Sequence, residues 1–120
     1  MTAPNLRNPT AITGKTDLTS NLNTSATDIL TNPTNSDKVY KINAIFASNT
    51  NASVDGVVSI GVYDQSNLTY LAYNLDVPAK STQIISTKET YFYLEEGISI
   101  RAFRSGSTGM AVTIGYEELS

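Results

Sequence analysis

Apolar and polar side chains alternate along several short segments of this chain, and this alternation restricts the fold more than any other feature. Between Val39 and Ser48, every second residue is apolar. Successive side chains of a β-strand point to opposite faces of its sheet, so a period of two is typical of a strand with one buried face. The segment therefore predicts a strand whose inward face is Tyr40, Ile42, Ala44 and Phe46.

Short clusters of polar residues divide the rest of the chain into similar segments. Asn49–Ser53 and Asp64–Asn67 are two such clusters, and Pro78 ends an alternating segment because proline has no amide proton for the ladder. Turn signals recur roughly every 8 to 12 residues, which is the spacing of an all-β sandwich. Seven to nine strands are expected. One to three short strands lie within Ile12–Lys15, Asp17–Leu22 and Ala26–Leu30, and the others are Val39–Ser48, Val54–Tyr63, Thr69–Val77, Ser81–Thr87, Tyr91–Leu94, Ile98–Phe103 and Met110–Tyr116.

Alternation also predicts the buried faces of other strands. In Ile98–Phe103 the inward residues should be Ile98, Ile100 and Ala102, and in Met110–Tyr116 they should be Met110, Val112, Ile114 and Tyr116. The inward face of Val54–Tyr63 should be Val54, Val58, Ile60 and Val62. In Thr69–Val77, the inward residues should be Leu71, Tyr73, Leu75 and Val77, opposite Tyr70, Asn74 and Asp76.

Small uncharged polar side chains fill an unusual share of the chain. Thr (16), Ser (13) and Asn (11) occupy 40 of the 120 positions. These side chains compete for backbone hydrogen bonds inside a helix, but they suit turns and the solvent face of strands. Together with the alternation they predict a single-domain, all-β fold, an antiparallel β-sandwich of jelly-roll or immunoglobulin-like type.

The N-terminal residues differ from the rest of the chain. Leu6 is the only sizeable apolar side chain in residues 1–8 apart from Met1, so this stretch cannot bury enough surface to order itself. We expect an extended arm over residues 1–11 and the sandwich over residues 12–120. The arm is predicted either to lie along its own domain or to lie on a neighbouring subunit. In the second arrangement the residues that contact the other chain are Pro4, Leu6, Arg7 and Ile12.

The side chains of common catalytic sites are missing or badly placed. The sequence has no His and no Cys, which removes the usual neutral-pH base, the thiol nucleophile and the best zinc ligands. The acidic pairs Glu95–Glu96 and Glu117–Glu118 are adjacent in sequence, so their carboxyl groups do not converge on one substrate. We therefore expect a non-enzymatic protein without catalytic or cofactor-binding residues.

Charge and hydropathy argue against several classes of partner. The net charge is −3 and the eight Lys and Arg residues are scattered, so nucleic acid is not an expected partner. Asp55, Asp64 and Asp76 lack the spacing of an EF-hand, so no metal site is predicted. The first residues do not resemble a secretory signal, and no stretch approaches the ~18 apolar residues of a membrane span. A soluble protein made in a cytoplasm, with no membrane partner, is expected.

Seven tyrosines are the main candidates for contacts with a partner. Most are expected to lie in the core or on a sheet face with the hydroxyl group at the surface. Tyr63 and Tyr70 flank one turn and point away from the predicted inward sets, so they are the candidate exposed aromatics. Such residues can serve a protein interface or a carbohydrate platform.

Several strings of the sequence are similar to a known family. The chain resembles small virion structural proteins of tailed bacteriophages, of the type found in phages of cyanobacteria and other marine bacteria. The similarity spans nearly the whole chain after residue 10, and it is carried by strand and turn patterns with no reactive motif. The strings are Ile12-Thr-Gly-Lys-Thr16, Thr24-Ser-Ala-Thr-Asp-Ile-Leu-Thr-Asn32, Lys38-Val-Tyr-Lys-Ile-Asn43, Tyr93-Leu-Glu-Glu-Gly-Ile-Ser-Ile100 and Tyr116-Glu-Glu-Leu-Ser120.

The resemblance implies a non-enzymatic head decoration or cement protein. Such a protein would be made in the host cytoplasm and would bind the outer surface of the capsid. It would stabilise the head through arm and edge-strand contacts, with the major capsid protein and copies of itself, as a homotrimer, for partners. Two alternatives remain open, a neck or tail structural protein and a carbohydrate-binding attachment module.

Overall fold

The structure is a computed structural model that describes residues 9–120, and it consists of nine strands in two antiparallel sheets around one hydrophobic core. The predicted all-β sandwich is confirmed. The only helical turn in the described residues is the 3-10 turn η1 (Lys88–Thr90). Sheet A contains β1 (Ile12–Thr19), β9 (Met110–Leu119), β3 (Val39–Asn49), β6 (Ser81–Ser86) and β7 (Phe92–Leu94). Sheet B contains β2 (Thr27–Thr31), β8 (Ser99–Ser105), β4 (Gly56–Tyr63) and β5 (Leu68–Val77).

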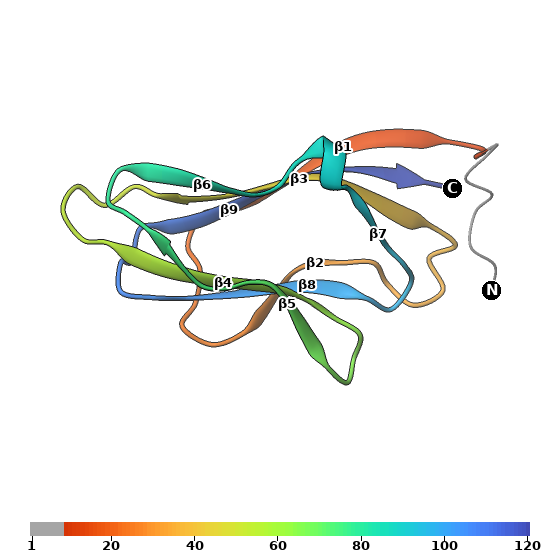
Figure 1. Cartoon of the computed structure of the whole chain (residues 1–120). Helices are drawn as coiled ribbons and strands as arrows, with labels where there is room; N and C mark the ends of the chain where they lie inside the picture. Colours follow the sequence, from red (N-terminus) through yellow and green to blue (C-terminus); the bar gives the residue numbers. More distant parts are fainter. Residues whose placement is uncertain (1–8) are drawn as a thin grey trace.

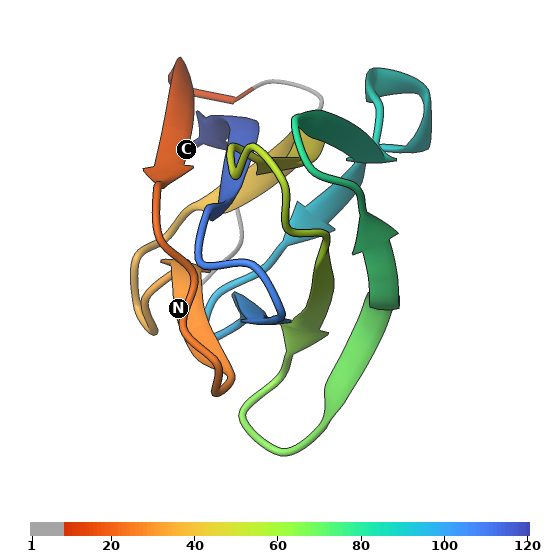
Figure 2. The same cartoon turned by 90° about the vertical axis from the view of Figure 1, so that its left-hand side faces the viewer.

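The strands pair in a nested order. β1 pairs with β9, β2 with β8, β3 with β6 and β7, and β4 with β5, as in one long folded hairpin. The hairpin rolls up so that β3 also pairs with β9 and β4 with β8. The resulting orders, β1-β9-β3-β6 and β2-β8-β4-β5, are those of a jelly roll and not of an immunoglobulin-like sandwich. Figure 1 shows the sheets as two layers, and Figure 2 views them from the end with the β3–β4 and β8–β9 loops.

The inward faces of β4, β8 and β9 follow the predicted alternation. Their apolar residues pack between the two sheets and form the centre of the core. One prediction for these strands is wrong, because Val54 lies before β4 begins at Gly56 and its side chain is exposed. The fully buried residues of the three strands are Val58, Ile60, Ile100, Ala102, Met110, Val112 and Ile114.

An extra residue in β3 reverses the faces of this strand halfway along. The β9 partners of Ile42 and Ala44 are consecutive residues, so Asn43 is a bulge. Beyond a bulge, the side chains of a strand lie on the opposite face from the one that unbroken alternation assigns. The prediction that Ala44 and Phe46 face the core is therefore wrong, and both lie on the outer face of sheet A. The side chains buried in their place are those of Ile45 and Ala47.

The edge strand β5 contains two extra residues. Between Leu75 and Ala72 it advances three residues while β4 advances two, and a second extra residue, Leu71, follows. These bulges change which side chains point inward. The predicted inward positions of Leu71 and Tyr73 are wrong, because both side chains are exposed, whereas Leu75 and Val77 pack into the core as predicted.

At each end of the sandwich, the side chain of a buried asparagine joins loops and strand ends through hydrogen bonds. The amide of Asn49 donates to the carbonyl oxygens of Val54 and Val77, at 2.9 and 3.0 Å. Its oxygen accepts from the Ser107 hydroxyl group at 2.8 Å and from the Asn51 amide at 3.0 Å. These bonds join the β3–β4 loop, the end of β5 and the β8–β9 loop, so every polar atom of this buried side chain is paired.

Asn32 has the same role at the opposite end. Its amide donates to the carbonyl oxygens of Lys38 and Leu94, each at 2.9 Å, and its side-chain oxygen accepts from the Ser36 hydroxyl group. The β2–β3 loop is thereby fastened to the end of β7. In a chain without cysteine, these two amides supply the cross-links between loops that a disulfide would otherwise provide.

The first described residues pair with the end of the same chain. The amide of Ala11 donates to the carbonyl oxygen of Ser120, and the amide of Ser120 donates to that of Ala11, each at 3.0 Å. Ile12 then begins β1 opposite Leu119, with its side chain exposed on the outer face. Its contact with another chain stays a prediction. The other residues predicted for the arm contact, Pro4, Leu6 and Arg7, lie outside the described residues.

The Asn49→Ala substitution should destabilise the protein strongly. It removes the donor to the carbonyl oxygens of Val54 and Val77 and the acceptor of the buried Ser107 hydroxyl group, at a cost of about 3 kcal/mol. Urea unfolding followed by circular dichroism measures the change in the free energy of unfolding. Asn21→Ala, at an exposed position, is the matched control and should change that free energy by less than about 0.5 kcal/mol. Equal effects of the two substitutions would contradict the loop-joining role of Asn49.

Candidate functional site on the outer faces of the two sheets

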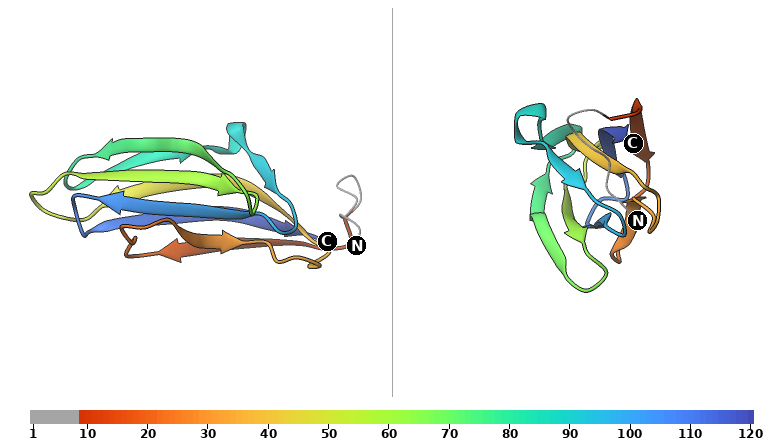
Figure 3. Two further views of the ribbon diagram at one scale, coloured as in Figure 1. Left: turned by 90° about the horizontal axis from the view of Figure 1, so that it is seen from below. Right: turned by 90° about the vertical axis from the view of Figure 1, so that its right-hand side faces the viewer.

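The outer face of sheet B carries a row of residues that crosses all four strands. Tyr70 of β5 lies opposite Gly61 of β4. Gly61 also lies opposite Arg101 of β8, which lies opposite Asp28 of β2. The left view of Figure 3 looks onto this side of the molecule, where the four strands run next to one another. Side chains from every strand of the sheet can therefore contact one ligand on this face.

An aromatic cluster occupies the β5 side of this face. The rings of Tyr70 and Tyr73 lie edge to face with centroids 4.7 Å apart, and Phe103 lies edge-on to Tyr70 at 6.3 Å. This is a favoured geometry of aromatic pairs. Tyr73 is 62% exposed and Tyr70 is 40% exposed, so the cluster presents ring surface to solvent. We call Tyr63, Tyr70, Tyr73 and Phe103, together with Arg101 and Asp28, the aromatic platform.

A charged pair occupies the β2 side of the platform. Arg101 Nε donates to Asp28 Oδ1 at 2.6 Å, and Ser99 Oγ donates to the same oxygen at 2.8 Å. The Arg101 guanidinium also lies over the ring of Tyr63, 3.5 Å from its centroid. Partial burial raises the pKa of Asp28, but the hydrogen bonds from Arg101 and Ser99 outweigh burial and hold this pKa below its ordinary value. The pair is therefore ionised at neutral pH, and its two charges cancel.

The structure brings the two predicted aromatic residues to one face. Tyr70 is exposed, and Tyr63 is half-buried because Arg101 covers its ring. Tyr73 lies on the same face, although alternation predicts it in the core. Phe103 and Arg101 lie there too, and the alternation in β8, which places both opposite the inward residues of that strand, is the signal that identifies them.

Gly61 at the centre of the platform cannot carry a side chain. A Cβ atom there would lie 2.6 Å from the carbonyl oxygen of Thr69 and 2.9 Å from a methyl carbon of Leu68. The bulged strand β5 passes this close to β4 just where the register between them shifts. The absence of a side chain at Gly61 therefore allows the two strands to pair beneath the aromatic cluster.

The outer face of sheet A carries an apolar row. Leu18 of β1 lies opposite Thr113 of β9, and Thr113 lies opposite Phe46 of β3. Phe46 in turn lies opposite Ile84 of β6. Leu18 is 74% exposed, Phe46 37% and Ile84 61%. We call these three exposed side chains the apolar row, and they form one line across the sheet.

Two glycines lie beside the apolar row without a reason in the packing of the chain. Gly14 and Gly115 are on the same face of β1 and β9 as Leu18 and Thr113. A Cβ atom built at either glycine meets no other part of the molecule within 4 Å. Glycine inside a strand costs about 0.5–1 kcal/mol relative to alanine, and it often marks a place where another backbone approaches closely.

A charged cluster surrounds Glu118 near the end of β9. Glu118 Oε2 lies 2.9 Å from Lys15 Nζ and 3.6 Å from Lys38 Nζ. Partial burial raises the pKa of Glu118, but the hydrogen bond from Lys15 and the positive charge of Lys38 outweigh burial and lower this pKa overall. Burial, together with the negative charge of Glu118, raises the pKa of Tyr40 to about 12. The cluster thus stabilises an ionised carboxylate between two lysines and a neutral phenol.

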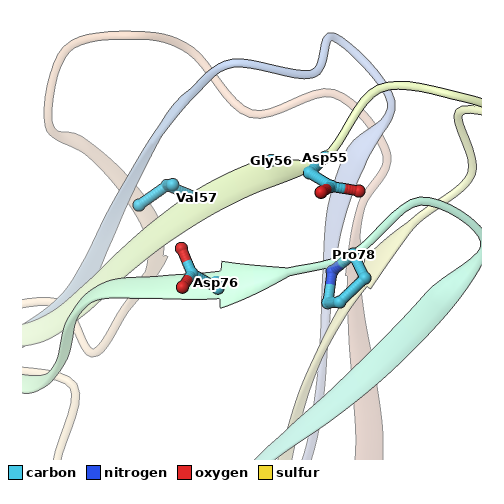
Figure 4. Close-up of a pocket in the computed structure, with 5 residues that line it drawn as sticks. All are labelled: Asp55, Gly56, Val57, Asp76 and Pro78. Carbon is cyan, nitrogen blue, oxygen red and sulfur yellow. The ribbon is translucent and has the colours of Figure 1, made fainter.

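One pocket in the described residues is lined by two carboxylates. Asp55 and Asp76 line a pocket beside β4 and β5 (Figure 4), and Asp55 Oδ1 accepts a hydrogen bond from the Ala79 amide at 2.9 Å. Asp64 lies at the other end of β4, so the three aspartates considered for calcium are not brought together. Within residues 9–120, no three acidic side chains are placed to hold a metal ion. The other residues that line the pocket are Gly56, Val57 and Pro78.

Comparison with protein families, with curated proteins and with solved structures finds no match for this chain. The phage resemblance therefore stays a prediction that rests on the sequence strings. In the part of the chain that the structure describes, no helix is long and apolar enough to cross a lipid bilayer.

The Glu118→Gln substitution should lower stability at pH 7 but not in strong acid. Because the pKa of Glu118 is lowered by folding, its carboxylate stabilises the folded state above the unfolded-state pKa. This contribution is lost as the pH falls through the folded-state pKa. Urea unfolding of the wild type and of Glu118→Gln, repeated at successively lower pH from pH 7, should give free energies of unfolding that converge. Glu95→Gln, in the turn before β8, should follow the wild type, and a constant offset for Glu118→Gln would contradict the assignment.

Alanine at Gly61 and at Gly115 should have opposite consequences. At Gly61 the new methyl group overlaps the Thr69 carbonyl oxygen, which should cost about 1–3 kcal/mol and separate β5 from β4. At Gly115 the methyl group has open space, so the free energy of unfolding should stay unchanged or rise by up to about 1 kcal/mol. Urea unfolding measures both values. A Gly61→Ala protein as stable as the wild type would show that β5 is not held as described.

Proposed function

We propose that this chain is a non-enzymatic structural protein of a tailed-phage virion, a decoration or cement protein that binds the outer surface of the head and stabilises it. Its partners are then the major capsid protein and further copies of itself. The observation that carries the proposal is the apolar row of sheet A with the glycines beside it. The sequence resemblance supplies the virion context, and jelly rolls are common among viral capsid proteins.

The apolar row has the character of a protein-binding face. Three large apolar side chains lie in solvent on a sheet whose neighbouring positions are small, among them Gly14 and Gly115. Contiguous exposed apolar patches on a monomer commonly mark interaction sites. An exposed apolar sheet face suits the broad surface of another protein, which supports attachment to a capsid.

The size of this face supports an assembly of several copies. Four strands about 4.8 Å apart and the ten residues of β9 at ~3.3 Å each give an area of roughly 600 Å². A standard stable interface buries about 800 Å² on each partner. One copy alone would bind weakly through this face, whereas linked copies bind with avidity. A homotrimer with additional arm and edge-strand contacts would meet this requirement.

A neck or tail component is the alternative within the same class. The apolar row could equally join neighbouring copies in a ring around the tail axis. The two locations differ in symmetry, since a trimer suits the head and a ring of about six or twelve copies suits the tail axis. Light scattering of the purified protein separates these stoichiometries.

The location of the protein in intact particles tests the proposal directly. Gold-labelled antibodies raised against the purified full chain should decorate the heads of particles from the phage that encodes it. Label on the neck or tail alone would replace the decoration role with the alternative. Particles that carry no label and contain none of the protein by mass spectrometry would overturn the virion proposal.

Variants of the apolar row test the face itself. The double substitution L18S/I84S should reduce the copies bound to heads lacking the protein by at least about tenfold, the equivalent of ~1.4 kcal/mol of binding free energy. Tyr73→Ser, on the opposite face of the sandwich, is the control and should bind like the wild type. All three positions are exposed, so both variants should keep the wild-type free energy of unfolding. If L18S/I84S binds heads as well as the wild type does, sheet A is not the docking face.

A further inference from the structure

The aromatic cluster on sheet B depends on a strained backbone position. Asn74 has φ = 51°, in the left-handed region that residues other than glycine rarely adopt. The amide of Asn74 donates to Ser59 Oγ at 2.9 Å, and Ser59 is buried on the neighbouring strand. Strain of this kind persists only where the surroundings hold it, and it gathers at functional sites. The bulge at Asn74 is thus fixed by a specific hydrogen bond and is not a loose edge.

The bulge at Asn74 exposes the ring of Tyr73 to solvent. Without an extra residue, alternation from Leu75 would point Tyr73 into the core, where it could bury its ring. With the bulge, Tyr73 is mostly exposed and packs edge to face against Tyr70. Bulges beside binding sites commonly re-aim a side chain in this way. The bulge therefore leaves the ring of Tyr73 exposed on the aromatic platform where unbroken alternation would bury it.

The polar side of the platform indicates the charge of its ligand. Arg101 and Asp28 neutralise each other through a 2.6 Å hydrogen bond, and Arg101 is further held over the ring of Tyr63. An anionic ligand would have to compete with Asp28 for the guanidinium, and the chain carries a net charge of −3. A neutral ligand faces no such competition. The remaining N–H groups and the second carboxylate oxygen can still donate to and accept from hydroxyl groups.

We propose that the aromatic platform is a binding site for neutral saccharides. A sugar ring has an apolar C–H face, which would lie on the rings of Tyr73 and Tyr70, and hydroxyl groups, which would bond to the Asp28–Arg101 pair. Tyr70 and Asp28 lie three strand spacings apart, about 14 Å, so an oligosaccharide spans both parts of the site. The platform lies on the opposite side of the sandwich from the apolar row. It would therefore stay free when sheet A is docked.

Glycan binding by the purified full chain tests this site. An array of neutral and acidic oligosaccharides should give signals for neutral members, and isothermal titration calorimetry with the best of them gives a dissociation constant. Tyr73→Ala should weaken that affinity by about tenfold, because the ring contact is lost. Tyr91→Ala is the matched control, since Tyr91 is also exposed and edge-on to a tyrosine, Tyr93, but lies at the other sheet.

Three outcomes would overturn the saccharide site: an array without signal, an affinity that Tyr73→Ala leaves unchanged, and binding of acidic sugars alone. A fourth is a wild-type protein that binds no sugar but loses head binding when Tyr73 is replaced by alanine. The last outcome would assign the platform to a protein partner. Unfolding curves of Tyr73→Ala and Tyr91→Ala should match the wild type, so loss of sugar binding would not reflect loss of fold. Because head docking is tested on sheet A, either proposal can fail while the other stands.

Discussion

The side-chain period of two in a β-strand is the constraint on which the rest of this structure depends. One extra residue in a strand moves every later side chain to the other face, and this chain contains such residues in β3 and in β5. The bulge at Asn43 turns Phe46 out of the core and brings Ile45 and Ala47 into it. The bulges of β5 turn Tyr73 out in the same way. Each candidate binding face therefore includes a side chain, Phe46 or Tyr73, that an interruption of this alternation turns out of the core.

Such interruptions need a frame that holds the register elsewhere. Asn49 and Asn32 provide part of it, because each buried amide bonds to loops that are distant in sequence and fixes where strands begin and end. The nested pairing of the jelly roll provides the rest, since the central strands β3 and β9 and the central strands β4 and β8 each have partners on both sides. The hydrogen bond from the Asn74 amide to Ser59 of β4 ties the bulged backbone at Asn74 to this frame.

The two outer faces differ in chemistry in a manner that suits two kinds of partner. Sheet A presents apolar side chains and open glycines without a charged pair in the row, which favours a broad protein surface. Sheet B presents tyrosines beside a neutralised Arg101–Asp28 pair, which favours a neutral ligand with hydroxyl groups. A thin sandwich holds both faces rigidly on opposite sides. Under the two proposals, sheet A would dock on an assembly while sheet B stays accessible.

Local patterns in the sequence were sufficient to predict the strands, the polar turns, the single domain and the antiparallel sandwich, because period two and turn residues act over a few positions. They also identified Tyr70 and Tyr63 as outward-facing. They could not choose between jelly roll and immunoglobulin-like order, because strand partners are set by contacts between residues far apart in the chain. They misplaced Phe46, Leu71 and Tyr73, because a bulge is defined by the count of residues on the partner strand. Only the tertiary structure, which sets the two strands against each other, decides which face of the sheet those residues occupy.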